Sequence, residues 1–223
     1  MKPNKILIAV PMLKKVDAEF FRSMIGLDTG GTKAVLGVAV ESLIDSARND
    51  LVRQAIEGNC DYIMWFDSDM IFEADTLRRF IKHAEDGLEY VCGLYFARQI
   101  PTVPVIAKTL DYNLDPETGK ISGGAEIYLD YPRDQLFEIA ASGFGGVMVK
   151  TSLFQEVIES FKVGPFDRLP QFGEDYSFCY RLQQMGKKMY CDSSIKFGHV
   201  GTYVYTEGTY LDCIRREMED DCK

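Results

Sequence analysis

The chain has 223 residues, of which 46% are hydrophobic and 26% charged, a composition typical of a single globular domain with a substantial core. Its formal net charge of −9 argues against a nucleic-acid or anionic-membrane partner, because both require clustered Lys and Arg. No apolar segment approaches the length of a membrane span. The six cysteines lack Cys-x-x-Cys spacing, which favours reduced thiols and a cytoplasmic location.

Strands and helices alternate over the first hundred residues. We expect strands at 5–10, 34–40, 62–66 and 90–96, and helices at 16–24, 42–57 and 74–85. Successive strand-helix-strand units imply right-handed crossovers. The pattern therefore predicts an α/β domain with a mainly parallel sheet and helices on both faces.

Two carboxylates follow the apolar run Tyr62–Phe66 directly, in Asp67-Ser68-Asp69. The run lacks polar alternation, which predicts a strand buried on both faces, and ligands bind beyond the carboxyl ends of such strands. In an extended chain Asp67 and Asp69 point the same way, and a hard divalent cation would relieve their repulsion. The same residues also suit a solvated turn that caps the next helix. The local sequence does not distinguish a cation site from such a turn.

The pattern changes after residue 100. Turn residues at 115–120 separate short strands at 103–108 and 126–129, which predicts a small antiparallel hairpin or flap at the edge of the domain. A glycine-rich segment, 142–146, precedes an apolar strand at 147–149. Such glycines either permit a turn or let a ligand approach the backbone.

Further polar residues lie near the end of the chain. Glu174 and Asp175 open a predicted helix that ends near residue 185, and acids in a first turn are ordinarily cap stabilisers. His199 lies between glycines in a predicted loop, where a ligand role is plausible. The tail from Arg215 is charged and predicts a surface helix or a frayed end.

The segment Gly26–Lys33 contains Asp28-Thr29-Gly30-Gly31 and resembles the phosphate-binding turn of actin-like sugar kinases. In those kinases the turn follows the first strand and a second nucleotide motif occurs. Here a strand and a helix precede the turn, and no second motif is found. A glycine-rich connection between helix and strand is the favoured interpretation.

The order of these signals, from about Lys5 to Gly201, resembles that of the GT-A fold glycosyltransferases. The resemblance implies a Rossmann-like fold with an Asp-x-Asp motif that binds a divalent metal, Mn²⁺ or Mg²⁺. The implied metal ligands are Asp67, Asp69 and His199. The implied nucleotide-sugar contacts are Pro11, Arg48, Asn49, Asp67, Gly145 and Gly146. The implied catalytic residues are Asp175, as general base of an inverting enzyme, and Glu174 as the second candidate.

The resemblance also implies how one domain, 1–223, is divided. We expect a nucleotide-binding half (1–100), a hairpin insertion (101–135), an acceptor and catalytic half (136–205) and a tail (206–223). The expected activity is metal-dependent transfer of a sugar from a UDP- or GDP-sugar to a hydroxyl of a glycan, protein or small molecule. Inversion and retention both remain open, because a retaining enzyme needs no such base.

Two departures and three alternatives accompany this interpretation. No Gln-x-x-Arg-Trp follows the acidic pair, unlike in processive polysaccharide synthases, and little chain follows His199 for an acceptor domain. A non-catalytic nucleotide- or glycan-binding member of the same fold is the first alternative. A sugar nucleotidyltransferase is less favoured because the segment 11–15 has no glycine for a triphosphate loop. The actin-like kinase is the third.

Overall fold

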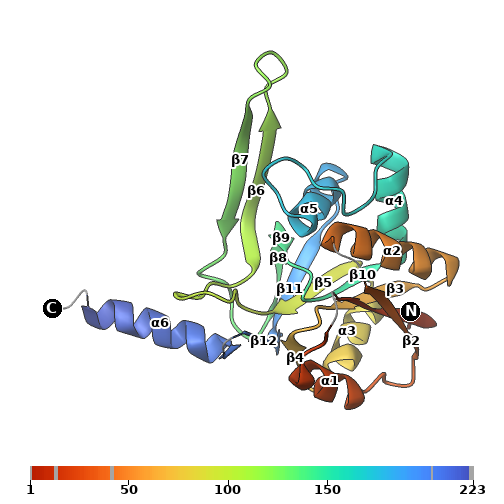
Figure 1. Ribbon diagram of the computed structural model, residues 1–223, viewed down its shortest axis with the longest axis horizontal. Helices are drawn as coiled ribbons and strands as arrows, with labels where there is room; N and C mark the ends of the chain where they lie inside the picture. Colours follow the sequence, from red (N-terminus) through yellow and green to blue (C-terminus); the bar gives the residue numbers. More distant parts are fainter. Residues whose placement is uncertain (1, 13–14, 41–42, 202, 221–223) are drawn as a thin grey trace.

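A seven-stranded sheet crosses the body of the protein, with its strands in the order β2-β1-β3-β10-β5-β11-β8 (Figure 1). This computed structural model describes residues 2–12, 15–40, 43–201 and 203–220. The strands of the sheet are β1 (Lys5–Met12), β2 (Lys33–Val40), β3 (Tyr62–Phe66), β5 (Tyr90–Leu94), β8 (Leu136–Ile139), β10 (Gly146–Lys150) and β11 (Met189–Lys196). The four strands expected in the first hundred residues are confirmed, as is the α/β class.

The sheet is mixed, so the mainly parallel sheet that we expected is not confirmed. β1 is parallel to β2 and β3, and β5 to β11. β10 is antiparallel to both β3 and β5, and β8 is antiparallel to β11. The apolar run of β10 predicts burial on both faces but carries no information on direction. Because Gly146 pairs with Phe66, the glycine-rich segment lies at the carboxyl end of β3.

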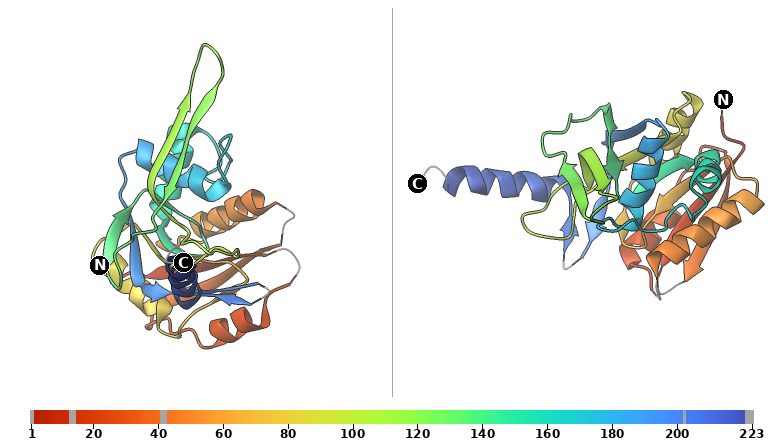
Figure 2. Two further views of the ribbon diagram at one scale, coloured as in Figure 1. Left: turned by 90° about the vertical axis from the view of Figure 1, so that its left-hand side faces the viewer. Right: turned by 90° about the horizontal axis from the view of Figure 1, so that it is seen from above.

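Helices cover both faces of this sheet (Figures 1 and 2). One face carries α2 (Ile44–Glu57), α4 (Thr151–Phe161) and α5 (Glu174–Gln184), and the other carries α1 (Ala18–Ile25) and α3 (Thr76–Glu85). Strand β3 contributes to both cores, since Trp65 packs under the first group and Phe66 under the second. Successive strand residues point to opposite faces. The prediction that this strand is buried on both faces is confirmed.

Local capping chemistry sets the start of α1. α1 begins at Ala18, two residues later than predicted, because the N–H of Glu19 donates to Asp17 Oδ1 at 3.0 Å and makes Asp17 the N-cap. α2 begins at Ile44; position 42, where we expected its start, lies outside the described residues.

The insertion forms an antiparallel hairpin of β6 (Ile106–Leu114) and β7 (Ile121–Ile127). The hairpin is longer than predicted and stands out from the body (Figure 1). Short strand β9 (Ala141–Ser142) pairs with its base. Tyr112 packs on Phe172 and Tyr180, at ring-centroid distances of 5.7 and 5.4 Å, so the hairpin rests against α5 and the segment before it.

A small sheet joins the segment after β3 to the end of the chain. β4 (Met70–Ile71) pairs with β12 (Gly198–Val200), which pairs with β13 (Val204–Tyr205). In this register His199 lies opposite Met70. Backbone pairing therefore brings His199 beside the two carboxylates that follow β3.

The chain then continues into α6 (Glu207–Asp220), which extends away from the body (Figure 1). This helix begins before Arg215, from which we expected a surface helix or a frayed end. Residues 221–223, which include Cys222, lie outside the described part. Cys60, Cys92, Cys179, Cys191 and Cys213 are free thiols. No helix within the described ranges is both long and apolar enough to span a membrane.

Candidate functional site

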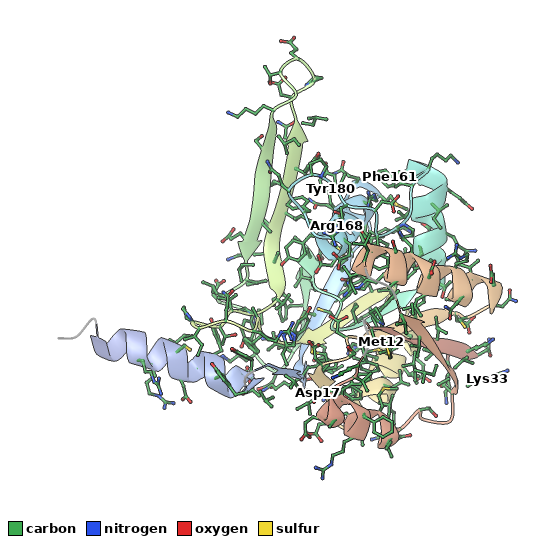
Figure 3. All side chains as sticks on the ribbon, viewed as in Figure 1. Met12, Asp17, Lys33, Phe161, Arg168 and Tyr180 are labelled. Carbon is green, nitrogen blue, oxygen red and sulfur yellow. The ribbon has the colours of Figure 1, made fainter. Side chains whose placement is uncertain are left out.

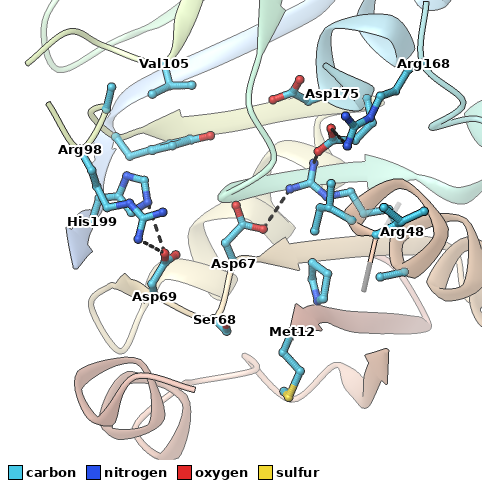
Figure 4. Close-up of a pocket in the computed structure, with 17 residues that line it drawn as sticks. Met12, Arg48, Asp67, Ser68, Asp69, Arg98, Val105, Arg168, Asp175 and His199 are labelled. Carbon is cyan, nitrogen blue, oxygen red and sulfur yellow. Dashed lines mark hydrogen bonds and ion pairs between the residues drawn. The ribbon is translucent and has the colours of Figure 1, made fainter. Parts of the chain in front are cut away.

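A cavity of about 690 Å³ opens beyond the carboxyl ends of β1 and β3 (Figure 4). This is where open α/β sheets bind ligands. Its lining residues are Pro11, Met12, Leu43, Ile44, Ala47, Arg48, Asp67, Ser68, Asp69, Tyr95, Ala97, Arg98, Val105, Arg168, Glu174, Asp175 and His199. The cavity thus brings together most of the site residues that the sequence pattern singles out. The exceptions are Asn49, Gly145 and Gly146.

Asp67 is the first residue after β3, and Arg48 holds its side chain. Arg48 Nη2 donates to Asp67 Oδ1 at 3.0 Å. The guanidinium of Arg48 lies over the rings of Phe144 and Phe166, 5.2 and 5.7 Å from their centroids, which fixes it by packing and cation–π attraction. Burial raises the pKa of Asp67, and the charge of Arg48 only partly offsets this. A second cation near Asp67 would therefore stabilise its carboxylate.

Asp69 meets a different arginine. Arg98 Nη1 is 2.8 Å from Asp69 Oδ2, and His199 Nε2 is 3.6 Å from the same oxygen. Burial alone would raise the pKa of Asp69, but His199 and Arg98 together lower it. Asp69 is therefore ionised at neutral pH.

His199 turns its Nε2 toward the cavity because its other ring nitrogen is occupied. Nδ1 lies 2.8 Å from the carbonyl oxygen of Phe96. A carbonyl only accepts hydrogen bonds, so Nδ1 carries the hydrogen and Nε2 of the neutral ring presents a lone pair. Proteins orient metal-binding histidines in this way.

Asp67, Asp69 and His199 offer the carboxylate oxygens and the imidazole nitrogen that Mn²⁺ accepts, and the carboxylates suit Mg²⁺. Among the described residues, however, no group of three or more His, Cys, Asp or Glu side chains is gathered around a point where an ion could bind. Arg98 engages Asp69 instead. Asp67, Asp69 and His199 thus supply suitable ligand atoms for a divalent cation and line the same cavity. For an ion to bind there, Asp69 would have to release Arg98.

Glu174 opens α5 and is held between two arginines. Arg48 Nη1 is 3.4 Å from Glu174 Oε1, and Arg168 Nη2 is 3.7 Å from Oε2. Arg168 also pairs with Asp45 of α2 at 3.3 Å. These contacts tie α2 to α5. Each carboxylate oxygen of Glu174 thus faces a guanidinium at ion-pair distance.

Asp175 has a different environment although it is the next residue. No ion pair to it occurs among the described residues, and its Oδ1 accepts a hydrogen bond from the N–H of Tyr176 at 2.7 Å. Burial, together with the nearby charge of Glu174, raises the pKa of Asp175 to about 6, although the charge of Arg48 opposes the shift. A carboxyl group with this pKa is suited to general-base chemistry near neutral pH. Figure 4 shows the side chain facing the cavity across from Asp67.

Asn49 follows Arg48 on α2 but does not line the cavity. Its Nδ2 donates to Asp167 Oδ1 and its Oδ1 accepts from the N–H of Phe166, both at 3.0 Å. Consecutive helical residues point in different directions, so Arg48 and Asn49 do not face one ligand together. Asn49 instead positions the loop whose Phe166 supports Arg48.

Gly145 and Gly146 also serve packing. A Cβ on Gly146 would lie 2.4 Å from the ring of Phe197, and one on Gly145 would lie 2.2 Å from Met70 Cε. The N–H of Gly145 donates to the hydroxyl of Tyr95 at 3.3 Å. The absence of a side chain at these glycines thus leaves room for neighbouring side chains. Neither glycine lines the cavity, although the family resemblance implies that both contact the nucleotide sugar.

We expect Gly146→Ala to lower the free energy of unfolding by about 1–3 kcal/mol, because overpacking a core costs this much. Phe197 is only 3% exposed, so its ring has no space to move aside. Denaturant unfolding measures the loss. Gly124→Ala is the matched control, since a Cβ there meets nothing within 4 Å. Equal stability of both variants would contradict this account.

The sequence interpretation missed Tyr95, Arg98 and Arg168. Tyr95 follows β5 directly and packs edge-on against His199 at 5.7 Å, so the rule that selects Asp67 at the end of its strand would also have selected Tyr95. The two arginines lie in irregular segments, where periodicity carries no signal. The Gly30–Gly31 turn does not line the cavity, and Gly30 lies against Arg78.

No protein-family model matches this sequence, and neither does any curated protein. Solved structures do match it, among them the crystal structure of A197 from STIV. That structure has a TM-score of 0.58 and 15% sequence identity, and the match covers 88% of this chain and 86% of A197. At this level of identity the likeness shows the fold alone. The protein is thus a mixed-sheet α/β protein that shares its fold with A197 over most of both chains.

Proposed function

We propose that this protein is a metal-dependent glycosyltransferase of the GT-A fold, which transfers a sugar from a nucleoside-diphosphate sugar to an acceptor hydroxyl. One observation carries the proposal: Asp67, Asp69, His199 and Asp175 converge on one cavity at the carboxyl edge of the sheet. Its volume, about 690 Å³, falls within the range of roughly 300–1,000 Å³ typical of small-molecule sites.

The lining of the cavity differs in chemistry from one part to another. An apolar part comes from β1, α2 and the residue before α2: Pro11, Met12, Leu43, Ile44 and Ala47. The acids and arginines described above line the rest, from Arg98 on one side to Arg48 on the other. A nucleoside-diphosphate sugar also differs in chemistry along its length, with an aromatic base followed by a diphosphate and a polar sugar. We assign the base to the apolar part and the diphosphate to the Asp67–Asp69 corner.

Sugar transfer breaks the bond from the anomeric carbon to the diphosphate and forms a bond to the acceptor oxygen, which loses a proton. A divalent cation held by Asp67, Asp69 and His199 would neutralise charge that develops on the leaving diphosphate. Arg48 keeps Asp67 oriented toward that position. In an inverting reaction Asp175 accepts the proton of the acceptor hydroxyl, while Glu174 anchors the arginines.

Donor turnover tests the proposal. A panel of UDP- and GDP-sugars with Mn²⁺ is screened first by thermal shift, because a ligand that binds only the native protein raises its melting temperature. The best donor should then release its nucleoside diphosphate slowly, with water as the acceptor. Binding without release would favour a non-catalytic member of the fold, and formation of pyrophosphate from a nucleoside triphosphate and a sugar phosphate would favour a nucleotidyltransferase. Failure of every donor to bind would contradict the proposal.

A further inference from the structure

Arg98 lies beside Asp69 at one side of the cavity. Among the described arginines, it is the one that forms an ion pair with this carboxylate. Its side chain is 49% exposed, and Nη1 also lies 3.3 Å from the carbonyl oxygen of Val200. Figure 4 shows the guanidinium beside Asp69 and His199, on the far side of the cavity from Arg48. Arg98 therefore occupies the position where the proposed metal would bind Asp69.

The partly buried carboxylate of Asp69 is stabilised by a positive charge beside it. Asp69 Oδ2 lies 2.8 Å from Arg98 Nη1 and 3.6 Å from His199 Nε2. In the ligand-free protein the guanidinium of Arg98 is therefore the permanent cation at this carboxylate.

The turn that carries Arg98 is closed by contacts that do not involve the guanidinium. Ala97 N–H donates to the Val103 carbonyl at 2.9 Å, and the Thr102 hydroxyl donates to the Ala97 carbonyl at 2.5 Å. The stem of Arg98 lies over Gly201, where a Cβ would be 3.2 Å from Arg98 Cδ. The polar contacts of the guanidinium are those to Asp69 and Val200.

We propose that Arg98 is an exchangeable cation: it neutralises Asp69 in the ligand-free protein and is displaced when a divalent cation is bound there. The released guanidinium then turns into the cavity and donates to the oxygens of the donor's diphosphate, a group that the planar guanidinium fork fits well. This inference rests on the proposed function, since it assigns Arg98 to the diphosphate of the same donor. Two positive charges would then oppose the charge of the leaving group.

Arg98→Met tests the exchange, because it keeps an apolar stem and removes the charge. Without nucleotide, we expect Mn²⁺ to bind the variant about fivefold more tightly than the wild type, since no ion pair has to be broken. With Mn²⁺ present, we expect UDP or GDP to bind about tenfold more weakly, because a charge-assisted contact is lost. Calorimetry measures both affinities. A residue with only a structural role would not move them in opposite directions.

Arg168→Met is the matched control. Arg168 is also 49% exposed and lines the same cavity, but it pairs with Asp45 and Glu174. Its loss changes the net charge equally, so we expect Mn²⁺ affinity without nucleotide to stay within about twofold, because screening weakens distant charges.

The possible failures are distinguishable. Mn²⁺ binding to the wild type with no tightening in Arg98→Met would overturn the exchange and leave the proposed function standing. Tighter Mn²⁺ binding with unchanged UDP and GDP affinity would overturn the diphosphate contact. No Mn²⁺ binding by either protein would overturn the metal site on which the proposed function depends.

Discussion

Asp69→Asn is expected to abolish metal-dependent binding of a nucleotide sugar while the fold stays intact. The amide has nearly the same shape as the carboxylate but no charge, and the backbone bond from Val200 N–H to the Asp69 carbonyl, at 2.8 Å, does not depend on the side chain. We expect Mn²⁺ affinity to fall more than about a hundredfold, because loss of even an outer-shell partner costs about 10–100-fold. Calorimetry with Mn²⁺ and the donor measures the loss, and thermal melting checks the fold.

Asp111→Asn is the control for this experiment. Asp111 is exposed on β6, outside the cavity lining, and its substitution removes the same charge. We expect Mn²⁺ and donor affinities to match those of the wild type. Unchanged affinity in Asp69→Asn would count against the metal role of the Asp67–Asp69 corner, and equal losses in both variants would point to net charge alone.

Asp175→Asn should keep donor binding and lose sugar transfer. Positioned general bases contribute about 10²–10⁴-fold to rate, and the amide cannot accept the proton of the acceptor hydroxyl. In the wild type, burial raises the pKa of Asp175 to about 6, and the ionised form is the active one. The transfer rate should therefore rise about tenfold per pH unit below pH 6 and level off above it. Initial rates between pH 4.5 and 8, with calorimetric donor affinities, test both expectations.

The same pKa has a consequence for stability. Because the native pKa of Asp175, about 6, lies above its ordinary value of 3.8, the native state binds more protons between these values, and the stability contribution of Asp175 declines as pH rises through this window. Asp175→Asn escapes this decline, so its melting temperature relative to the wild type should be higher at pH 8 than at pH 4. If Asp175→Asn still transferred sugar with the pH dependence of the wild type, Asp175 would be excluded as the base.

Glu174→Gln provides the comparison. It weakens the ion pairs to Arg48 and Arg168 that join α2 to α5, so we expect lower thermal stability. The pH dependence of transfer should persist, because Asp175 remains. This contrast separates a positioning acid from a base although the two residues are adjacent.

Much of the fold could be predicted because its signals are local. The apolar run at 62–66 predicts a strand buried on both faces, and Trp65 and Phe66 do pack into the two opposite cores. Placement of polar residues after that strand selects Asp67 and Asp69 as candidates, because carboxyl ends of strands meet at one edge. Residues with a packing role were harder to distinguish from residues that bind a ligand. Asn49, Gly145 and Gly146 match the family pattern, yet their contacts are to Asp167, Tyr95 and Phe197.

The sequence by itself determined the strands of the first hundred residues and the types of side chain available at their ends, since these depend on neighbours a few residues apart. Only the tertiary structure decided the direction of β10, the pairing of Asp69 with Arg98 and the difference between Glu174, which lies between two arginines, and Asp175, to which no ion pair is formed within the described part of the chain. Charge pairing and desolvation depend on distances in space between residues far apart in the chain, and no local pattern encodes those distances.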